Sequence, residues 1–131
     1  MTSDDASMDG YSVEVTNQVA REIIEEVNNT IVQSEDQKYK ALLTIYDDLT
    51  PLIVNTNGTV AKYRIEIEIK YELLQIDNDE VISKGTTRGF AQYDVTSSEI
   101  VNEDTKKSMT KIATKNAIQL MASRIQSSIS R

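Results

Sequence analysis

The chain has 131 residues, of which 39% are hydrophobic, and a formal net charge of −7 at pH 7. This length suits a single domain with a sizeable core. Because Cys and His are both absent, thiol nucleophiles, disulfides, Cys/His zinc sites and histidine bases are excluded. An acidic chain is also a poor general binder of nucleic acid, since affinity there depends on neutralising phosphates.

The first ten residues differ in composition from the rest of the chain. No apolar run approaches the roughly 20 residues of a membrane-spanning helix, and no signal peptide is recognisable. Residues 1–10 are polar, and we expect them to be a disordered tail or a leader added by cloning. Residues 11–131 are then expected to form one domain.

A short strand and an amphipathic helix are expected to open this domain. Tyr11–Val15 places three apolar side chains on one side of a strand. Thr16 or Asn17 then offers a helix N-cap. The apolar residues that follow at helical spacing are Val19, Ala20, Ile23, Ile24, Val27 and Ile31.

The next strand is predicted for Tyr39–Tyr46 and is expected to end at Asp47 and Asp48. Pro51 has no backbone N–H, so we expect the segment around it to stay out of a sheet centre. Asn57-Gly58 is a turn sequence, because it adopts positive φ at low cost.

The strictest pattern in the chain is the alternation of apolar and charged residues over Thr59–Gln75. It predicts a long strand with one apolar face. The charged face mixes Glu with Lys and Arg, which favours a solvated, cross-paired surface over a catalytic carboxylate pair. Asp77–Glu80 is expected to be a hairpin turn before a strand over Val81–Tyr93. Gly85 and Gly89 share one face of this strand, which indicates a bulge or a closely packed partner.

A long helix is predicted to end the chain, because Thr96–Glu99 matches a capping box and apolar residues recur after it. The main apolar stripe consists of Met109, Ile112, Ala113, Ala117, Leu120 and Met121. A second stripe is formed by Ile118, Ile125 and Ile129. It either contacts the first helix or, where it is exposed, marks a protein interface.

Together these elements follow the order (β)αβββα. A mostly antiparallel sheet with one apolar face needs cover, and two amphipathic helices supply it. The predicted fold is therefore an α+β two-layer sandwich with two helices packed on one face of the sheet.

The order and several segments of the chain resemble the lipopolysaccharide-assembly lipoprotein (LptE) family over Tyr11–Ile129. The segment Ser12–Arg21 joins a strand to the first helix, and Asn57–Ile65 is a turn followed by the long strand. The third segment that carries the resemblance is Arg88–Asp94. It is followed by an acidic cap and a helix that ends in Leu120–Ile125.

This resemblance implies a binding protein without catalytic activity or cofactor. Family members are lipoproteins on the periplasmic face of the Gram-negative outer membrane. They sit in or beneath a large β-barrel translocon (LptD-like), assist its assembly and help to export lipopolysaccharide. The family anchor is a lipidated Cys after a signal peptide. The resemblance thus implies a soluble fragment whose anchor, with part of the first strand, is missing.

The resemblance also directs attention to basic residues. Family members can carry them in the turn before the long strand and near the start of the last helix, where this chain has Thr56 and Asn102. Lys106, Lys107 and Lys111 lie within two to three turns of Asn102 and are the candidate lipid-binding residues. The alternative for these lysines is a solvated helix face.

No pocket chemistry is visible in the sequence, so the function is expected to depend on a surface. The candidate partner-binding residues are Leu52, Ile53 and Val54, which are more apolar than a connector needs, with Ile118 and Ile125 of the second stripe. No metal site is expected. An alternative function is a generic α+β protein-interaction or adaptor domain unrelated to lipid export.

Overall fold

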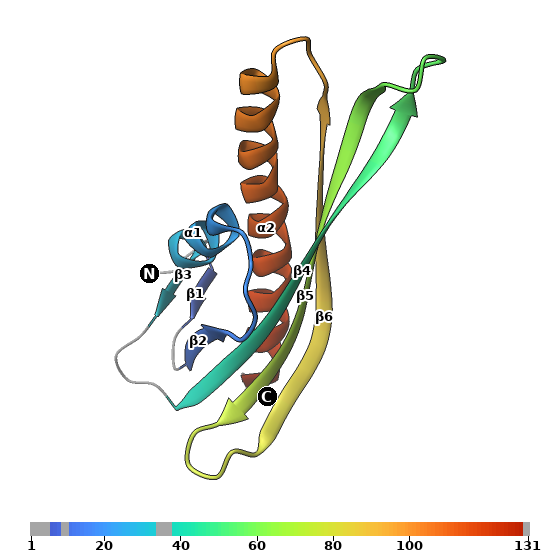
Figure 1. The fold of residues 1–131 in the computed structure, drawn as a ribbon. Helices are drawn as coiled ribbons and strands as arrows, with labels where there is room; N and C mark the ends of the chain where they lie inside the picture. Colours follow the sequence, from blue (N-terminus) through green and yellow to red (C-terminus); the bar gives the residue numbers. More distant parts are fainter. Residues whose placement is uncertain (1–5, 9–10, 34–37, 130–131) are drawn as a thin grey trace.

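The computed structural model describes residues 6–8, 11–33 and 38–129, and it shows two helices on one face of a four-stranded sheet (Figure 1). The helices are α1 (Arg21–Thr30) and α2 (Glu99–Ile129). The sheet has the order β2-β4-β5-β6, formed by Tyr11–Val15, Tyr39–Val54, Val60–Gln75 and Val81–Asp94. The predicted α+β sandwich is confirmed.

One pairing makes the sheet mixed: β2 runs parallel to β4, whereas β4, β5 and β6 form an antiparallel meander. A separate parallel pair joins β1 (Ala6–Met8) to β3 (Ile31–Gln33). Residues 6–8, which belong to the expected disordered tail or leader, form strand β1 of this pair. Residues 1–5 and 9–10, also part of that leader, lie outside the described residues.

The long strand β5 lies inside the sheet and supplies much of the core, as the alternation predicted. Its inward side chains are Ile65, Ile67, Ile69, Tyr71 and Leu73, each no more than 4% exposed. Burying one such side chain contributes roughly 1.5–3 kcal/mol relative to leaving it in water.

Helix α2 lies directly on the backbone of β6. A Cβ at Gly89 would collide with the carbonyl oxygen of Ala113 and would lie only 2.8 Å from the backbone nitrogen of Ala117. Beside this contact, the buried hydroxyl of Thr87 donates a hydrogen bond of 2.9 Å to the Ala117 carbonyl. At Gly85 the close neighbour is the ring of Tyr71. Both glycines therefore have the packing partners that their spacing indicated.

The predicted N-cap of α1 is wrong. Thr16 and Asn17 bind β4 instead, and α1 begins at Arg21. The Asn17 amide donates to the Ile45 carbonyl at 2.8 Å and accepts from the Ile45 N–H at 3.1 Å. The side chain thus takes the place that the next peptide of β2 would occupy.

The predicted end of the second strand is also wrong, because β4 continues through Asp47, Asp48 and Pro51 to Val54. The pairing with β2 covers only Tyr39–Leu43, so the far half of β4 lies at the edge of the sheet. Proline and charged residues are tolerated there, since one side of the strand makes no ladder.

The start of α2 differs from the predicted capping box in its residues. The Ser98 hydroxyl, rather than Thr96, accepts a hydrogen bond from the Val101 N–H at 3.3 Å. The side chain of Asn102 folds back onto Thr96, accepting from its N–H at 2.8 Å and donating to its carbonyl at 2.9 Å. Asn102 therefore fixes the connection between β6 and α2.

We expect Ile67→Asp to unfold the domain, because an unpaired charge in the fully buried layer costs several kcal/mol against a typical stability of about 5–15 kcal/mol. Glu68→Ala changes the neighbouring position on the outer face and should cost under about 1 kcal/mol. Chemical denaturation of both variants is the measurement, and equal losses would contradict the assignment of the two faces.

Gly89→Ala should destabilise the fold by at least about 3 kcal/mol, because the new methyl group meets backbone atoms of α2 that cannot move independently. Gly85→Ala is the matched control, since there the methyl meets the end of the Tyr71 side chain, which can rotate away. In thermal melts, Gly89→Ala should have a much lower melting temperature than Gly85→Ala.

Candidate functional site

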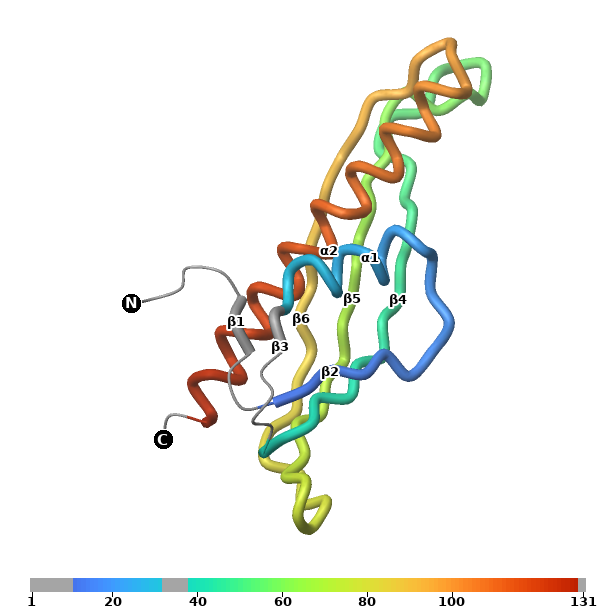
Figure 2. The backbone as a smooth tube through the Cα atoms, turned by 90° about the vertical axis from the view of Figure 1, so that its left-hand side faces the viewer, coloured from blue at the N-terminus to red at the C-terminus, as the bar shows by residue number. Residues whose placement is uncertain are grey.

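The paired ends of β4 and β5 form an arm that extends beyond α1 and carries exposed apolar side chains (Figures 1 and 2). We call the exposed Leu49, Leu52, Ile53 and Val54 the arm surface; their exposed fractions run from 38% to 58%. The register of β4 against β5 shifts between Pro51 and Val54. This irregularity brings several apolar side chains in succession to the surface.

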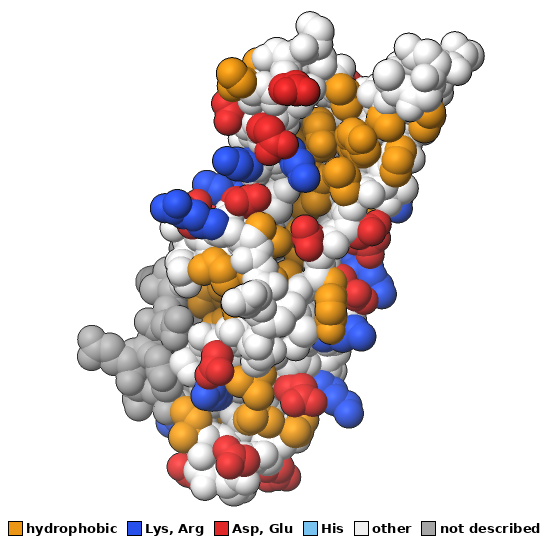
Figure 3. Space-filling view, in the orientation of Figure 1, with side chains coloured by type: hydrophobic (Ala, Val, Ile, Leu, Met, Phe, Trp, Pro, Cys, Tyr) orange, Lys and Arg blue, Asp and Glu red, His pale blue; other side chains and the backbone are white. Residues whose placement is uncertain are grey.

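The first turn of α2 lies at the same end of the molecule as the tip of the arm (Figure 1). It exposes Ile100 and Val101, at 77% and 48%. In the space-filling view, apolar side chains gather over the region between the start of α2 and the arm (Figure 3). An apolar concentration of this kind is typical of a protein interaction site.

Two of the predicted partner-binding residues do not belong to this surface. Ile118 and Ile125 are fully buried, so the prediction that they form an exposed interface is wrong. Helix α2 packs against both the sheet and α1, and its buried face is therefore wider than a single stripe. The exposed residues of the main stripe are instead Ile112 and Leu120, at 46% and 49%.

The three candidate lysines have different environments. The Lys111 Nζ lies 3.2 Å from Glu25 Oε1, and Glu25 also pairs with Arg21 at 3.3 Å. Lys111 therefore ties α2 to α1. Among the described residues, Lys106 and Lys107 make no ion pair and remain available to an anionic ligand.

The hydrogen bond and charge of Lys111 lower the pKa of Glu25, with a smaller contribution from Arg21. Lys111→Ala should therefore raise the pKa of Glu25, and Arg21→Ala should raise it less. A depressed carboxyl pKa stabilises the fold above the ordinary pKa of glutamate, and this stabilisation is lost as the pH falls through the folded value. An NMR titration of the Glu25 carboxyl carbon measures both shifts, and equal shifts would contradict the dominant role of Lys111.

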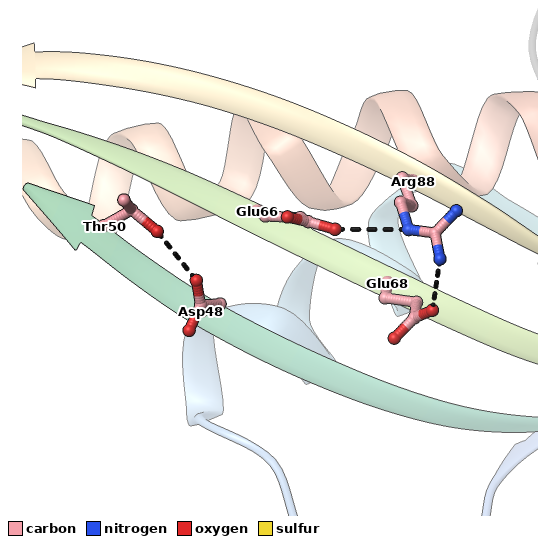
Figure 4. Close-up of polar contacts among 5 residues, drawn as sticks. All are labelled: Asp48, Thr50, Glu66, Glu68 and Arg88. Carbon is pink, nitrogen blue, oxygen red and sulfur yellow. Dashed lines mark hydrogen bonds and ion pairs between the residues drawn. The ribbon is translucent and has the colours of Figure 1, made fainter. Parts of the chain in front are cut away.

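The outer face of the sheet is cross-paired, as its sequence predicted. Arg88 lies between two carboxylates, 3.2 Å from Glu66 and 2.8 Å from Glu68 (Figure 4). On β4, Thr50 donates to Asp48 at 2.8 Å. Arg64 stacks over Phe90 at 5.4 Å from the ring centroid. The ion pairs that Glu66 and Glu68 share with Arg88 place both carboxylates in a cross-paired surface rather than in a catalytic pair.

Two hollows accompany these surfaces. A groove of about 700 Å³ on the outer sheet face is bordered by Leu42, Thr44, Lys70, Glu72, Lys84 and Thr86, among others. A smaller apolar recess of about 250 Å³ lies between β2 and α1, lined by Val13, Val15, Ile24, Val27, Asn28 and Ile31. Across the part of the chain that the structure describes, no three His, Cys, Asp or Glu residues are grouped to hold a metal ion.

Neither helix in the described ranges has the length and apolarity that crossing a membrane requires. The fold and its surface thus define an α+β domain whose most prominent feature is an exposed apolar arm. The chain belongs to the LptE lipopolysaccharide-assembly family, whose sequence profile matches residues 2–129. Among curated proteins, no sequence matches it significantly.

Solved structures show the same fold at low sequence identity. A protein from Caulobacter crescentus CB15 is 15% identical with a TM-score of 0.69, and the match covers 90% of each chain. Lipoprotein B from Nitrosomonas europaea is 14% identical with a TM-score of 0.64, covering 99% of this chain and 92% of its own. Rare lipoprotein B from Shewanella oneidensis is 17% identical with a TM-score of 0.57, covering 94% and 100%.

Proposed function

We propose that this chain is a non-enzymatic periplasmic subunit of the outer-membrane lipopolysaccharide translocon. It docks in an LptD-like β-barrel partner, assists the assembly of that barrel and supports glycolipid export. Membership of the LptE lipopolysaccharide-assembly family is the observation that carries this proposal. The arm surface and the start of α2 are the parts of the chain that we assign to the barrel.

The exposure of the arm supports this assignment. Ile53 and Val54 leave half or more of their surface in water, at 50% and 58%. Each Å² of apolar surface that a partner removes from water contributes about 25 cal/mol. Leu49 and Leu52 add adjoining apolar area, so a partner that covers the whole arm surface gains more than single scattered residues would give.

Contact with the glycolipid is assigned to Lys106 and Lys107, two lysines near the start of α2 that make no ion pair among the described residues. Lipopolysaccharide carries anionic groups, which attract exposed ammonium groups near a surface. Lys106 and Lys107 are available for this role, whereas Lys111 is held by Glu25 at 3.2 Å. The lipid-binding set proposed from the sequence is thereby reduced to Lys106 and Lys107.

We expect Ile53→Asp to abolish co-purification with the cognate barrel, because it places a charge in the centre of the arm surface. Val81→Asp is the matched control: Val81 has nearly the same exposure, 47% against 50%, but lies on the β5–β6 hairpin at the other end of the sheet. Affinity purification of the barrel with each tagged variant is the measurement. Circular dichroism confirms that both fold.

The double variant with Lys106 and Lys107 changed to Glu should retain the barrel and lose bound glycolipid.

If folded Ile53→Asp still recovers the barrel like wild type, the arm surface is not the docking site. If the wild type recovers neither barrel nor glycolipid, the alternative of an adaptor domain unrelated to lipid export gains support.

A further inference from the structure

The far half of β4 is a free strand edge. Its neighbour β2 stops at Val15, opposite Leu43, whereas β4 continues to Val54. In Figure 2 the chain that leaves β2 passes beside β4 before it enters α1, and beyond Leu43 no described strand pairs with this edge of β4.

The hydrogen bonds of Asn17 show which backbone groups face this edge. Both the N–H and the carbonyl of Ile45 bind the Asn17 side chain, so Ile45 points to the β2 side. The direction alternates along a strand, and the same side therefore receives the N–H and carbonyl groups of Asp47 and Leu49, and the carbonyl of Pro51. The even-numbered residues between them point to β5.

Pro51 fits this assignment. A proline lacks the N–H group, and within a sheet it is tolerated where that group would face solvent. Its position two residues after Leu49 places the missing N–H on the open side. Five backbone groups, two N–H donors and three carbonyl acceptors, are thus offered in a row between Asp47 and Pro51.

We propose that this edge, from Asp47 to Pro51, receives one extended segment of the β-barrel partner, which adds to the sheet as a strand beside β4. This proposal rests on the proposed function and specifies how the arm engages the barrel. Main-chain hydrogen bonds supply affinity in such strand addition, and side chains select the segment. The neighbouring Leu49, Ile53 and Val54 favour a segment with apolar residues.

Charge further defines the segment. Asp47 and Asp48 are both exposed, and in the described part of the chain neither forms an ion pair. A basic residue in the added segment would complement them. A second copy of this chain would instead bring like carboxylates together, and each copy carries a net charge of −7. The occupant is therefore a basic and apolar segment of the barrel rather than another copy.

Leu49→Pro and Leu49→Ala together test this mode of binding. Both remove the same side chain, but only the proline removes the outward N–H, and the ladder to β5 does not use that group. Leu49→Pro should weaken binding of the purified barrel about tenfold more than Leu49→Ala, as expected for one lost hydrogen bond whose acceptor stays unpaired. The affinity is measured with the detergent-solubilised cognate barrel.

Hydrogen exchange supplies an independent readout. The amides of Asp47 and Leu49 should exchange quickly in the free chain, and both should become protected in the complex with the barrel. Protection in the free chain, together with a dimer in analytical ultracentrifugation, would show that a second copy covers the edge and would overturn the proposal.

The other outcomes separate this proposal from the proposed function. An equal loss of affinity for the barrel in Leu49→Pro and Leu49→Ala would show that only the side chain makes contact, and strand addition would be wrong. If neither variant loses affinity while Ile53→Asp does, docking through the arm stands without strand addition. If Ile53→Asp and Leu49→Pro both bind like wild type, the arm is not the docking site and strand addition is wrong, whereas the barrel itself stands as the partner.

Discussion

The contact between Gly89 and α2 is the constraint on which the arrangement of the layers depends. A side chain at this position would occupy space that the backbone of α2 already fills. The helix therefore rests on the strand through backbone contact and the small side chains of Ala113 and Ala117. The Thr87 hydroxyl bonds the Ala117 carbonyl at 2.9 Å beside it. Close approach makes this contact dependent on shape, so it fixes the position of α2 more narrowly than larger, flexible side chains would.

This close contact at β6 has a consequence for the part of the same sheet face that lies over β4. Because α2 lies against β6 and β5, its opposite flank is left for α1, and Lys111 and Glu25 join the two helices there. Helix α1 has only ten residues and cannot cover the full length of β4. The far half of β4 is thus left without helical cover, and the exposed apolar residues Leu49 and Ile53 lie on this uncovered part.

Features that depend on local interactions could be predicted from the sequence, whereas features that depend on contacts between distant segments could not. The alternation in β5 depends on one strand and two faces, and its buried side chains agree with the prediction. The role of Asn17 and the continuation of β4 past Asp47 depend on which strand lies next to which, and a local pattern does not contain that information. Asn17 has a local preference for helix caps and Asp47 for strand ends, and in both cases the pairing of strands overrides that preference.

The candidate site shows the same division. The exposure of Leu52, Ile53 and Val54 followed from apolar residues in a segment with turn signals on both sides. The burial of Ile118 and Ile125 could not be predicted in this way, because it depends on α2 having two packing partners rather than one. Similarly, Lys111 differs from Lys106 and Lys107 only through Glu25, a residue far away in the chain.

The arm is held by the sheet rather than by the helices, and this bears on how it can bind. β5 is paired with β4 as far as Val60 and with β6 as far as Lys62, so three strands support the arm almost to its tip. A paired arm loses less conformational freedom on docking than a loop of the same length, because its backbone is already ordered. The exposed apolar side chains of the arm are therefore presented on a preorganised support, which leaves more of their burial energy available for affinity.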